Sequence, residues 1–378
     1  MYSLHSYGQM LGDATRMEAY TAALRRAVKP GSVILDLGCG PGVFALLACQ
    51  WGARRVYAVE PDNVIELARE AATANGFADR IEFFQNFSTD ITLPEKVDVI
   101  ISDLRGVLPW YQQHIPSIVD ARNRFLDAGG ILIPRRDVLW AAVVDAPDRY
   151  QEIVAPWQSD GLDLSAATRV VTNTWRKTRI NAADLLVEPS LWSTLDYLEI
   201  QDSDTSAEIV WQVARPGVAH GVNLWFDSEL IDEIGFSNHP AGPELIYGNG
   251  LLPFSQPIAV AEDDRIRVRL RADLIRDDYV WRWDTEFFSG ESATPKATFK
   301  QSTFFGAPLS PTQMRKQNAN YKPSLDEQGK ARSFILAQMT GEQSLAEIAT
   351  RLSEQFPERY ADWKEALDEV SAVSREFG

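Results

Sequence analysis

The chain has 378 residues, 45% hydrophobic and 24% charged, values typical of a globular protein with two or three domains. Its net charge of −16 disfavours a nucleic-acid-binding protein, because affinity for phosphate backbones depends on lysine and arginine. No apolar run approaches the roughly 18–20 residues that a membrane span needs. Residues 1–10 lack the features of a secretory signal, and Cys39 and Cys49 are the only cysteines, so we expect a cytoplasmic protein.

Strand and helix patterns alternate in the first third of the chain. Apolar runs predict strands over 32–37, 55–60, 81–84, 97–102 and 130–134. Periodic spacing predicts helices over 16–28, 43–50, 63–75 and 115–125. This alternation is typical of an α/β protein with a mostly parallel sheet, so we expect a Rossmann-like domain over residues 1–140.

The pattern changes after this domain. Residues 141–300 contain strand-like runs separated by Gly, Pro, Asn and Asp, which predicts a mostly β, barrel-like domain that binds the substrate. Residues 301–378 begin as a polar linker and regain helical periodicity from Ala331. Ser344 and Glu347 have capping-box spacing, so we expect a small helical module at the end of the chain.

The strongest chemical motif follows the first strand. Asp36 precedes the glycines Gly38, Gly40 and Gly42, and a helix follows them. Such a loop allows the backbone to approach a ligand closely beside free N–H groups at a helix start. Glu60 ends the second strand, where a carboxylate can accept hydrogen bonds from both ribose hydroxyls of a nucleoside cofactor, NAD or S-adenosylmethionine (SAM) alike.

Residues 7–144 resemble the protein arginine methyltransferases, in a class of SAM-dependent enzymes whose loop has the form Asp-x-Gly-x-Gly. The segment from Tyr7 to Tyr20 is similar to the part of that family that covers the cofactor. The resemblance implies that Arg16 pairs with the methionine carboxylate of SAM, that Met10 packs near the sulfonium, and that Glu60 holds the ribose. The implied cofactor-binding residues are Met10, Arg16, Asp36, Gly38, Gly40, Gly42, Glu60, Ser88, Thr89 and Asp103.

The predicted substrate loop departs from that family. The family grips its guanidinium substrate with two glutamates, but here Asp103 and Gln112 stand in their places. A guanidinium would face a single carboxylate at Asp103 and an N–H₂ donor at Gln112, which clashes with the N–H groups of the cation. The barrel segment Leu245–Gly250 also lacks the histidine that the family has there.

These departures predict an acceptor other than a standard arginine. Asp103 would orient or deprotonate the acceptor, and His114 is a second candidate base. Trp110 and Tyr111 either line the acceptor pocket or pack between the domains. The predicted catalytic residues are Asp103, Gln112 and His114.

We therefore expect a SAM-dependent methyltransferase acting on a nitrogen or oxygen of a protein, peptide or small molecule. The alternatives are an arginine methyltransferase with a divergent pocket, a non-catalytic SAM-binding interaction module and, disfavoured by the charge, an RNA methyltransferase. Residues 331–377 are similar to small winged-helix-like modules that bind peptides. The resemblance also implies a homodimer. The four histidines and two cysteines show no metal-ligand spacing, so no metal is expected.

Overall fold

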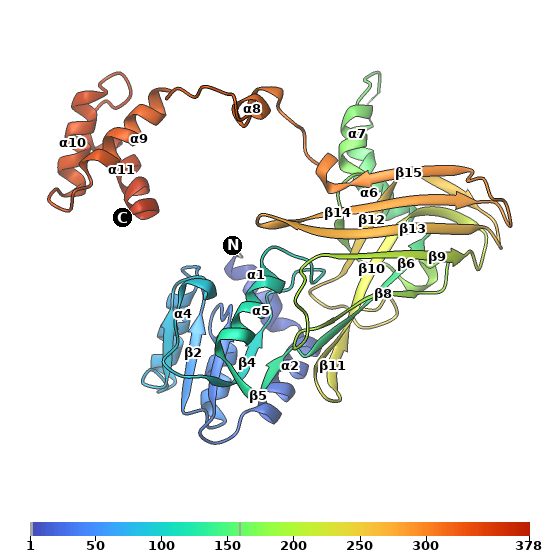
Figure 1. The fold of residues 1–378 in the computed structure, drawn as a ribbon, viewed down its shortest axis with the longest axis horizontal. Coiled ribbons are helices and arrows are strands. Elements are labelled where there is room, and N and C mark those ends of the chain that lie inside the picture. The colour runs from blue at the N-terminus through green and yellow to red at the C-terminus, as the bar shows by residue number, and fades with distance from the viewer. Residues whose placement is uncertain (1–2, 159) are drawn as a thin grey trace. The chain divides into compact units, whose positions relative to one another are not determined.

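The computed structural model describes residues 3–158 and 160–378, and the chain divides into two compact units, 1–308 and 309–378. The first unit combines a parallel sheet flanked by helices with antiparallel sheets, and the second contains helices (Figure 1). This architecture confirms the predicted fold class. The predicted domain boundaries at residues 140 and 300 stay a prediction.

The first part of unit 1 is a five-stranded parallel sheet in the order β3-β2-β1-β4-β5. Its strands are β1 (Val33–Leu37), β2 (Arg55–Val59), β3 (Ile81–Phe84), β4 (Val97–Ser102) and β5 (Leu126–Ile133). The order reverses between β1 and β4, and ligands of such sheets bind at this reversal, beyond the carboxyl ends of the strands.

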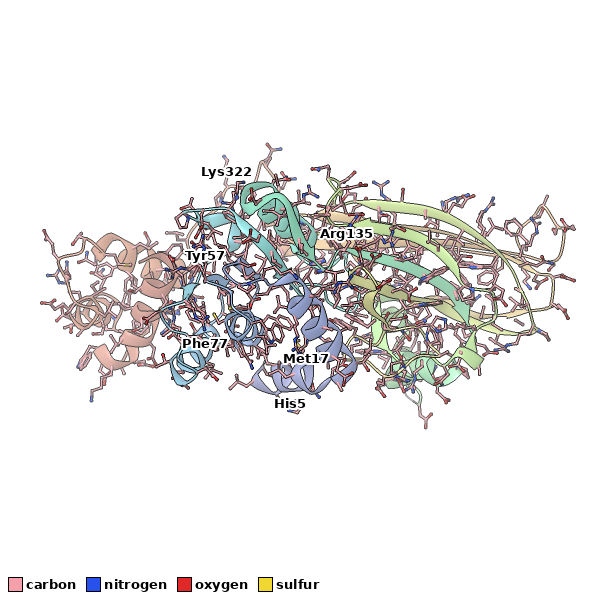
Figure 2. The ribbon with its side chains drawn as sticks, turned by 90° about the horizontal axis from the view of Figure 1, so that it is seen from below. His5, Met17, Tyr57, Phe77, Arg135 and Lys322 are labelled. Carbon is pink, nitrogen blue, oxygen red and sulfur yellow. The ribbon has the colours of Figure 1, made fainter. Side chains whose placement is uncertain are left out.

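Helices connect these strands and precede them. They are α1 (Leu4–Gly12), α2 (Ala14–Ala27), α3 (Val43–Gln50), α4 (Ile65–Ala74), α5 (His114–Phe125) and the short 3-10 helix η1 (Ser88–Asp90). Asp13 separates α1 from α2 and caps α2, since its carboxylate accepts a hydrogen bond from the backbone N–H of Arg16 at 3.1 Å. His5 and Met17 mark these two helices in Figure 2. The sequence patterns did not predict α1.

The second part of unit 1 contains two antiparallel sheets. One has the order β7-β12-β10-β6-β8, with β11 paired to β10, and the other has the order β15-β14-β13-β9. The first uses β6 (Arg136–Val144), β7 (Arg176–Thr178), β8 (Ser190–Asp196), β10 (Gly217–Ile231), β11 (Ile234–Ser237) and β12 (Asn249–Val260). The second uses β9 (Thr205–Gln212), β13 (Arg265–Ile275), β14 (Asp278–Phe288) and β15 (Ala297–Ser302).

Short helices interrupt this β region. They are α6 (Pro147–Val154), η2 (Ala155–Trp157), α7 (Ser165–Val171), η3 (Ala182–Asp184) and η4 (Thr303–Phe305). The predictions for this region missed α6 and α7, which follow β6 and precede β7 along the chain (Figure 1). Both helices are short, with 8 and 7 residues, so their periodic signal is weak.

One continuous hydrophobic core joins the parallel sheet to the antiparallel sheets. Arg135 lies in the short connection between β5 and β6, where the chain leaves the parallel sheet (Figure 2). Trp110, between β4 and α5, packs against Trp192 of β8 with ring centroids 4.7 Å apart. Burial of such large aromatic rings stabilises the two parts of unit 1 against each other.

The second unit contains α8 (Pro311–Lys316), α9 (Glu327–Gln338), α10 (Leu345–Gln355) and α11 (Trp363–Phe377). The last three helices bury their own core, which includes Ile335, Leu352 and Val370. The predicted capping box at Ser344 and Glu347 is confirmed, since each side chain bonds the other residue's backbone N–H. Residues 309–378, all of them described, contain no strand, so the β wing of a winged helix is absent from this unit.

Across residues 3–158 and 160–378, no helix combines the length and the apolar character that crossing a membrane requires.

Candidate active site

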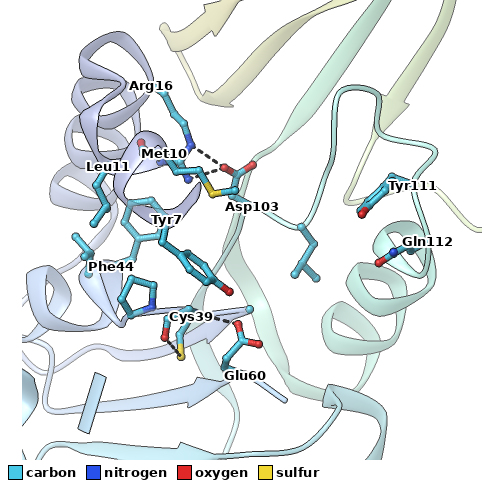
Figure 3. Close-up of a pocket in the computed structure, with 15 residues that line it drawn as sticks. Tyr7, Met10, Leu11, Arg16, Cys39, Phe44, Glu60, Asp103, Tyr111 and Gln112 are labelled. Atoms are coloured by element: carbon cyan, nitrogen blue, oxygen red, sulfur yellow. Dashed lines mark hydrogen bonds and ion pairs between the residues drawn. The ribbon is translucent and has the colours of Figure 1, made fainter. Parts of the chain in front are cut away.

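Two adjoining cavities lie at the carboxyl end of the parallel sheet. The glycine-loop cavity is lined by Tyr7, Met10, Leu11, Arg16, Gly38, Cys39, Gly40, Pro41, Val43, Phe44, Glu60, Asp103, Leu104, Tyr111 and Gln112 (Figure 3). The acceptor-side cavity is lined by Ser6, Gln9, Met10, Arg16, Asp103, Arg105, Gly106, Val107, Tyr111, Trp175, Lys177, Ile246 and Tyr247. Both cavities share Met10, Arg16, Asp103 and Tyr111, so these residues form the junction between them.

The glycine loop is shaped by a left-handed backbone. Gly38, Gly40 and Gly42 have φ values of +77°, +50° and +82°, which residues other than glycine rarely adopt. A Cβ atom on Gly40 would lie 2.7 Å from the ring of Tyr7, so the loop and α1 approach each other only because this position carries no side chain. Gly42 is the N-cap of α3 and does not line the cavity.

Glu60 closes the other wall of the glycine-loop cavity. It follows β2, and its carboxylate accepts bonds from the backbone N–H groups of Gly40 and Asp62, both at 3.0 Å. Burial raises the pKa of Glu60, while these two N–H groups oppose that shift. The carboxylate is therefore fixed at the cavity wall, where it can accept ribose hydroxyl hydrogens.

Asp36 lies below the loop and does not line either cavity. One of its oxygens accepts a hydrogen bond from the backbone N–H of Ala45 in α3 at 2.9 Å. Burial raises the pKa of Asp36 to about 7. The structure thus gives this predicted cofactor-binding residue a place behind the loop, where it ties the loop to α3.

Arg16 and Asp103 form a buried ion pair at the junction of the cavities. The Nη2 and Nε atoms of Arg16 donate to Asp103 Oδ2 at 2.6 and 2.8 Å (Figure 3). The hydroxyl of Tyr247 donates to the same oxygen at 2.6 Å. Although burial alone would raise it, Arg16 and then Arg105 hold the pKa of Asp103 below its usual value. Asp103 is therefore a paired anion whose protonation is disfavoured.

Arg105 lies behind Asp103 and was not predicted as a site residue. Its side chain has no exposed surface, and its Nε lies 3.3 Å from Asp103 Oδ1. It also donates to Asp137 of β6 and to Ser228 of β10, at 2.7 Å for the serine. The two arginines, Arg16 and Arg105, are thus balanced by the two carboxylates of Asp103 and Asp137.

Arg16 is buried, with 5% of its surface exposed, so it is not a solvent-exposed cation of α2. Asp13 helps to fix this part of α2, because its second oxygen accepts the backbone N–H of Ile246 at 2.7 Å. This bond ties the start of α2 to the segment that places Tyr247. Met10 lines both cavities, and its predicted contact with the sulfonium stays a prediction.

Gln112 and His114 have very different positions. Gln112 is exposed, has a φ of +44° and lines the glycine-loop cavity. His114 begins α5 and is 98% buried, since only 2% of its surface is exposed, and its Nε2 bonds the hydroxyl of Tyr197 at 3.1 Å. Burial and the nearby Arg105 charge lower the pKa of His114 to about 3. His114 does not line either cavity, so the structure does not bring this predicted base to the site.

Ser88 and Thr89 also lie outside both cavities. They belong to η1, where the Ser88 carbonyl accepts a bond from Arg124 Nη2 at 2.5 Å. Trp110 and Tyr111 were each expected either to line the acceptor pocket or to pack between the domains. Tyr111 lines both cavities. Trp110 instead packs in the aromatic cluster between the sheets, with Trp192 and Trp281.

Several lining residues were missed by the sequence analysis as site residues. Arg105 sits two residues after Asp103 within the loop already recognised, so its charge was a usable signal. Tyr247 stands in the segment noted only for lacking a histidine. Lys177 and Trp175 come from β7 and the residues before it, and no local pattern connects them to a loop about 70 residues earlier. Among the residues that the structure describes, no cluster of His, Cys, Asp and Glu could hold a metal ion.

Comparison with known proteins agrees with this geometry. A family model described as ribosomal protein L11 methyltransferase matches residues 15–146. The chain is 30% identical over 242 residues to a probable protein arginine N-methyltransferase 6 of Arabidopsis thaliana, covering 60% of this chain and 56% of that protein. It is 42% identical over 143 residues to protein arginine N-methyltransferase PRMT10 of Oryza sativa subsp. japonica, covering 37% and 38% of the two chains.

The chain thus spans about half or less of these relatives' length. The structural similarity extends over more of the chain than the sequence similarity. The crystal structure of Arabidopsis thaliana protein arginine methyltransferase 10, which its authors describe as uniquely open, superposes with a TM-score of 0.69 and 25% identity, over 79% of this chain and 97% of that one. In sequence and in fold, the chain resembles the protein arginine methyltransferases.

Proposed function

We propose that the chain is a SAM-dependent methyltransferase that transfers a methyl group to a nitrogen or oxygen atom of a protein, peptide or small molecule. The observation that carries this proposal is the junction of the two cavities at Met10, Arg16, Asp103 and Tyr111. A methyl donor in one cavity and an acceptor in the other would meet there. Similarity to methyltransferases over residues 15–146 supports the same function.

The residues of the glycine-loop cavity fit this cofactor. Gly38 and Gly40 line the cavity with bare backbone, and the Glu60 carboxylate is held at the wall by two backbone N–H groups. Arg16 lines the cavity and has five N–H donors. Bonds to Asp103, the Met10 carbonyl and Met17 Sδ use four of them, which leaves one N–H on Nη2. We propose that Glu60 binds the ribose and that Arg16 helps to bind the methionine carboxylate. When bound, SAM supplies an electrophilic methyl group on a sulfonium.

Asp103 acts in this proposal by orientation. Its Oδ2 atom already accepts bonds from Arg16 and Tyr247, and Arg105 lies beside Oδ1. Because the pKa of Asp103 is lowered by these arginines, the carboxylate is a poor proton acceptor. Of the two roles predicted for Asp103, the geometry favours orienting the groups around the acceptor over removing its proton.

The same contacts argue against a standard arginine acceptor. A substrate guanidinium needs carboxylate oxygens that are free to accept bidentate hydrogen bonds. Asp103 is neutralised by two arginines of the chain itself, and Gln112 is uncharged. A further cation beside this pair would lose its hydration, and its attraction to an already paired carboxylate would offset little of that cost.

Protein arginine N-methylation is the second candidate. The specific observation in its favour is the 42% identity with the rice protein arginine N-methyltransferase over 143 residues. The two candidates differ in the product that they predict, methylarginine for one and another methylated group for the other.

Two assays test the proposal. The chain is first incubated with SAM and an extract, and production of S-adenosylhomocysteine (SAH) is measured. We expect turnover in the wild type and its loss in Asp103→Asn, with SAH affinity nearly unchanged, because Asp103 positions the acceptor side. Mass spectrometry of arginine-rich peptides should then show no methylarginine. Turnover that persists in Asp103→Asn would contradict its placement at the reaction, and absence of turnover in the wild type would favour the non-catalytic alternative.

Location and assembly remain proposals of the same kind. Both cysteines, Cys39 and Cys49, are unpaired and buried, which supports a reducing compartment such as the cytoplasm. The homodimer implied by the resemblance can be measured by sedimentation of the full chain.

A further inference from the structure

The acceptor-side cavity carries a charge pattern that the proposed function does not by itself explain. Its lining contains three cationic side chains and one anionic side chain. The cations are Arg16, Arg105 and Lys177, and the anion is Asp103. Asp137, the second carboxylate of the buried cluster, lies behind Arg105 and is fully buried. Counting Asp137 as well, three cations face two anions. This cluster therefore carries an excess positive charge, which suits an anionic ligand.

Lys177 supplies that excess charge. It belongs to β7, and its ammonium donates to the backbone carbonyl of Ile246, beside Tyr247. An ammonium has three N–H donors, so two remain after this bond. Burial lowers the pKa of Lys177, and the negative charge of Glu244 opposes this shift. Glu244 is mostly exposed and pairs with Arg179 at 3.6 Å.

The described lining of the acceptor-side cavity also offers no free general base. It contains neither histidine nor cysteine, and its one carboxylate is Asp103, engaged by both arginines and Tyr247. Tyr247 is itself a donor to Asp103, and burial raises its pKa well above the usual value. Amines in water are protonated at neutral pH, and amides and hydroxyls must lose a proton on methylation. An acceptor that carries no proton avoids this requirement.

We propose that the acceptor is a carboxylate and that the product is its methyl ester. This inference rests on the proposed methyltransferase function. A carboxylate oxygen uses a lone pair to form the new C–O bond, the S–C bond breaks, and its electron pair stays on sulfur. The acceptor loses one negative charge, the donor loses its positive charge, and no proton is released. Lys177, which lines the cavity, orients the anion by charge-assisted hydrogen bonds, and Arg16 at the junction adds positive charge.

The test is a binding comparison on the full chain saturated with SAH. The probes are N-acetylglutamate amide, N-acetylglutamine amide and N-acetylarginine amide, which share a backbone and differ in the charge of the side chain. Ligand-observed NMR should show that the glutamate probe binds at least about tenfold more tightly than the arginine probe. Equal binding, tighter binding of the arginine or glutamine probe, or binding of none of them would overturn the inference.

Variants on one strand sharpen the comparison. Lys177→Gln should weaken the glutamate probe up to about fivefold and leave the glutamine probe unchanged, as expected for one partly exposed ion pair. Arg176→Gln is the matched control, because Arg176 precedes Lys177 on β7, is exposed and lines neither cavity of the site. If Lys177→Gln and Arg176→Gln have the same effect on the glutamate probe, Lys177 does not select the anion.

The chemistry of the product provides a second measurement. Product labelled from methyl-tritiated SAM should release its label as volatile methanol in mild alkali, because methyl esters hydrolyse and N-methyl groups do not. Label that is stable to alkali would overturn the inference. Failure of the two proposals is distinguishable. Absence of SAH binding contradicts the methyltransferase function, whereas SAH binding without a carboxylate preference contradicts only the identity of the acceptor.

Discussion

At the scale of single residues, the site is governed by which charges have partners. The sequence alone singled out Asp103, Gln112 and Arg16, and all three line the glycine-loop cavity. It could not show that Arg16 and Asp103 pair at 2.6 Å, because 87 positions separate them in the chain. Nor could it show that Arg105 and Tyr247 complete this pair from behind and from the barrel segment. Pairing over such distances depends on the tertiary fold.

His114 and Asp36 illustrate the same limit in opposite ways. Sequence proximity to the substrate loop made His114 a candidate base, but the helix that begins there directs its ring toward Tyr197 inside the protein. Asp36 lies in the correct motif, yet its carboxylate bonds Ala45 behind the loop. A motif predicts where a residue lies along the chain, whereas burial and partners determine what its side chain can do.

Asp36 leads to a pH prediction. Its pKa is raised by burial from 3.8 to about 7, so the folded chain binds this proton more tightly than the unfolded chain. The stabilising contribution is complete below about pH 4 and is lost as the pH rises through about 7. Relative to Asp36→Asn, the wild type should therefore lose about 1.4 kcal/mol of unfolding free energy per pH unit within that window. Urea unfolding at pH 5, 6, 7 and 8 measures this.

The control for Asp36→Asn is Asp232→Asn, at an exposed position, which should leave the pH profile of the wild type unchanged. A stability difference between wild type and Asp36→Asn that does not vary with pH would show that Asp36 is not the buried, titrating carboxylate described here.

At the scale of elements, the periodic patterns predicted the parallel sheet well. The predicted helix 43–50 and the predicted strands 81–84 and 97–102 coincide with α3, β3 and β4. The pattern failed for α1, whose nine residues bury no side chain completely and so lack a strong apolar stripe. Its importance comes from Tyr7 and Met10, which line the glycine-loop cavity, and from the close approach of the Tyr7 ring to Gly40. Helical periodicity does not predict this approach.

The junction of the glycine loop with α3 gives a prediction at this scale. Gly42 has a φ of +82°, and a Cβ there would lie 2.7 Å from the Cβ of Ala68 in α4. Gly76 has a φ of +71° but nothing within 4 Å of an added Cβ. Both Gly→Ala substitutions incur backbone strain of about 1–2 kcal/mol, and Gly42→Ala adds an overpacking cost of about 1–3 kcal/mol.

Chemical denaturation of the Gly42→Ala and Gly76→Ala variants measures the difference. We expect Gly42→Ala to be the less stable of the two and Gly76→Ala to report strain alone. If both variants lose the same unfolding free energy, α3 and α4 do not approach as closely as the structure shows.

At the scale of the whole molecule, the order of the parts followed from composition. An α/β part, a β part and a helical part appear in the predicted order. The continuous core that joins the first two parts was beyond prediction, because it is built from residues such as Trp110, Trp192 and Trp281 that lie far apart in the sequence. This core also explains why one compact unit extends to residue 308.

The separate core of the second unit predicts that unit 1 folds without it. All residues lining the two cavities belong to unit 1, and α9, α10 and α11 pack around their own buried side chains. A chain ending at Pro308 should therefore keep its SAH affinity within about twofold and its main unfolding transition. Scanning calorimetry and an SAH titration check this, and a large loss of affinity would mean that residues 309–378 contribute to the site.

A calorimetric titration of the full chain with SAH tests most directly whether the cavity between the glycine loop and Glu60 binds SAM. We expect saturable binding with one SAH per chain, weakened in Glu60→Ala by about 1.5–3 kcal/mol through loss of charged hydrogen bonds. Glu82→Ala, at an exposed position in β3, should bind SAH as the wild type does. Absence of SAH binding, binding of NAD in its place, or full affinity in Glu60→Ala would show that this cavity is not a SAM site held by Glu60.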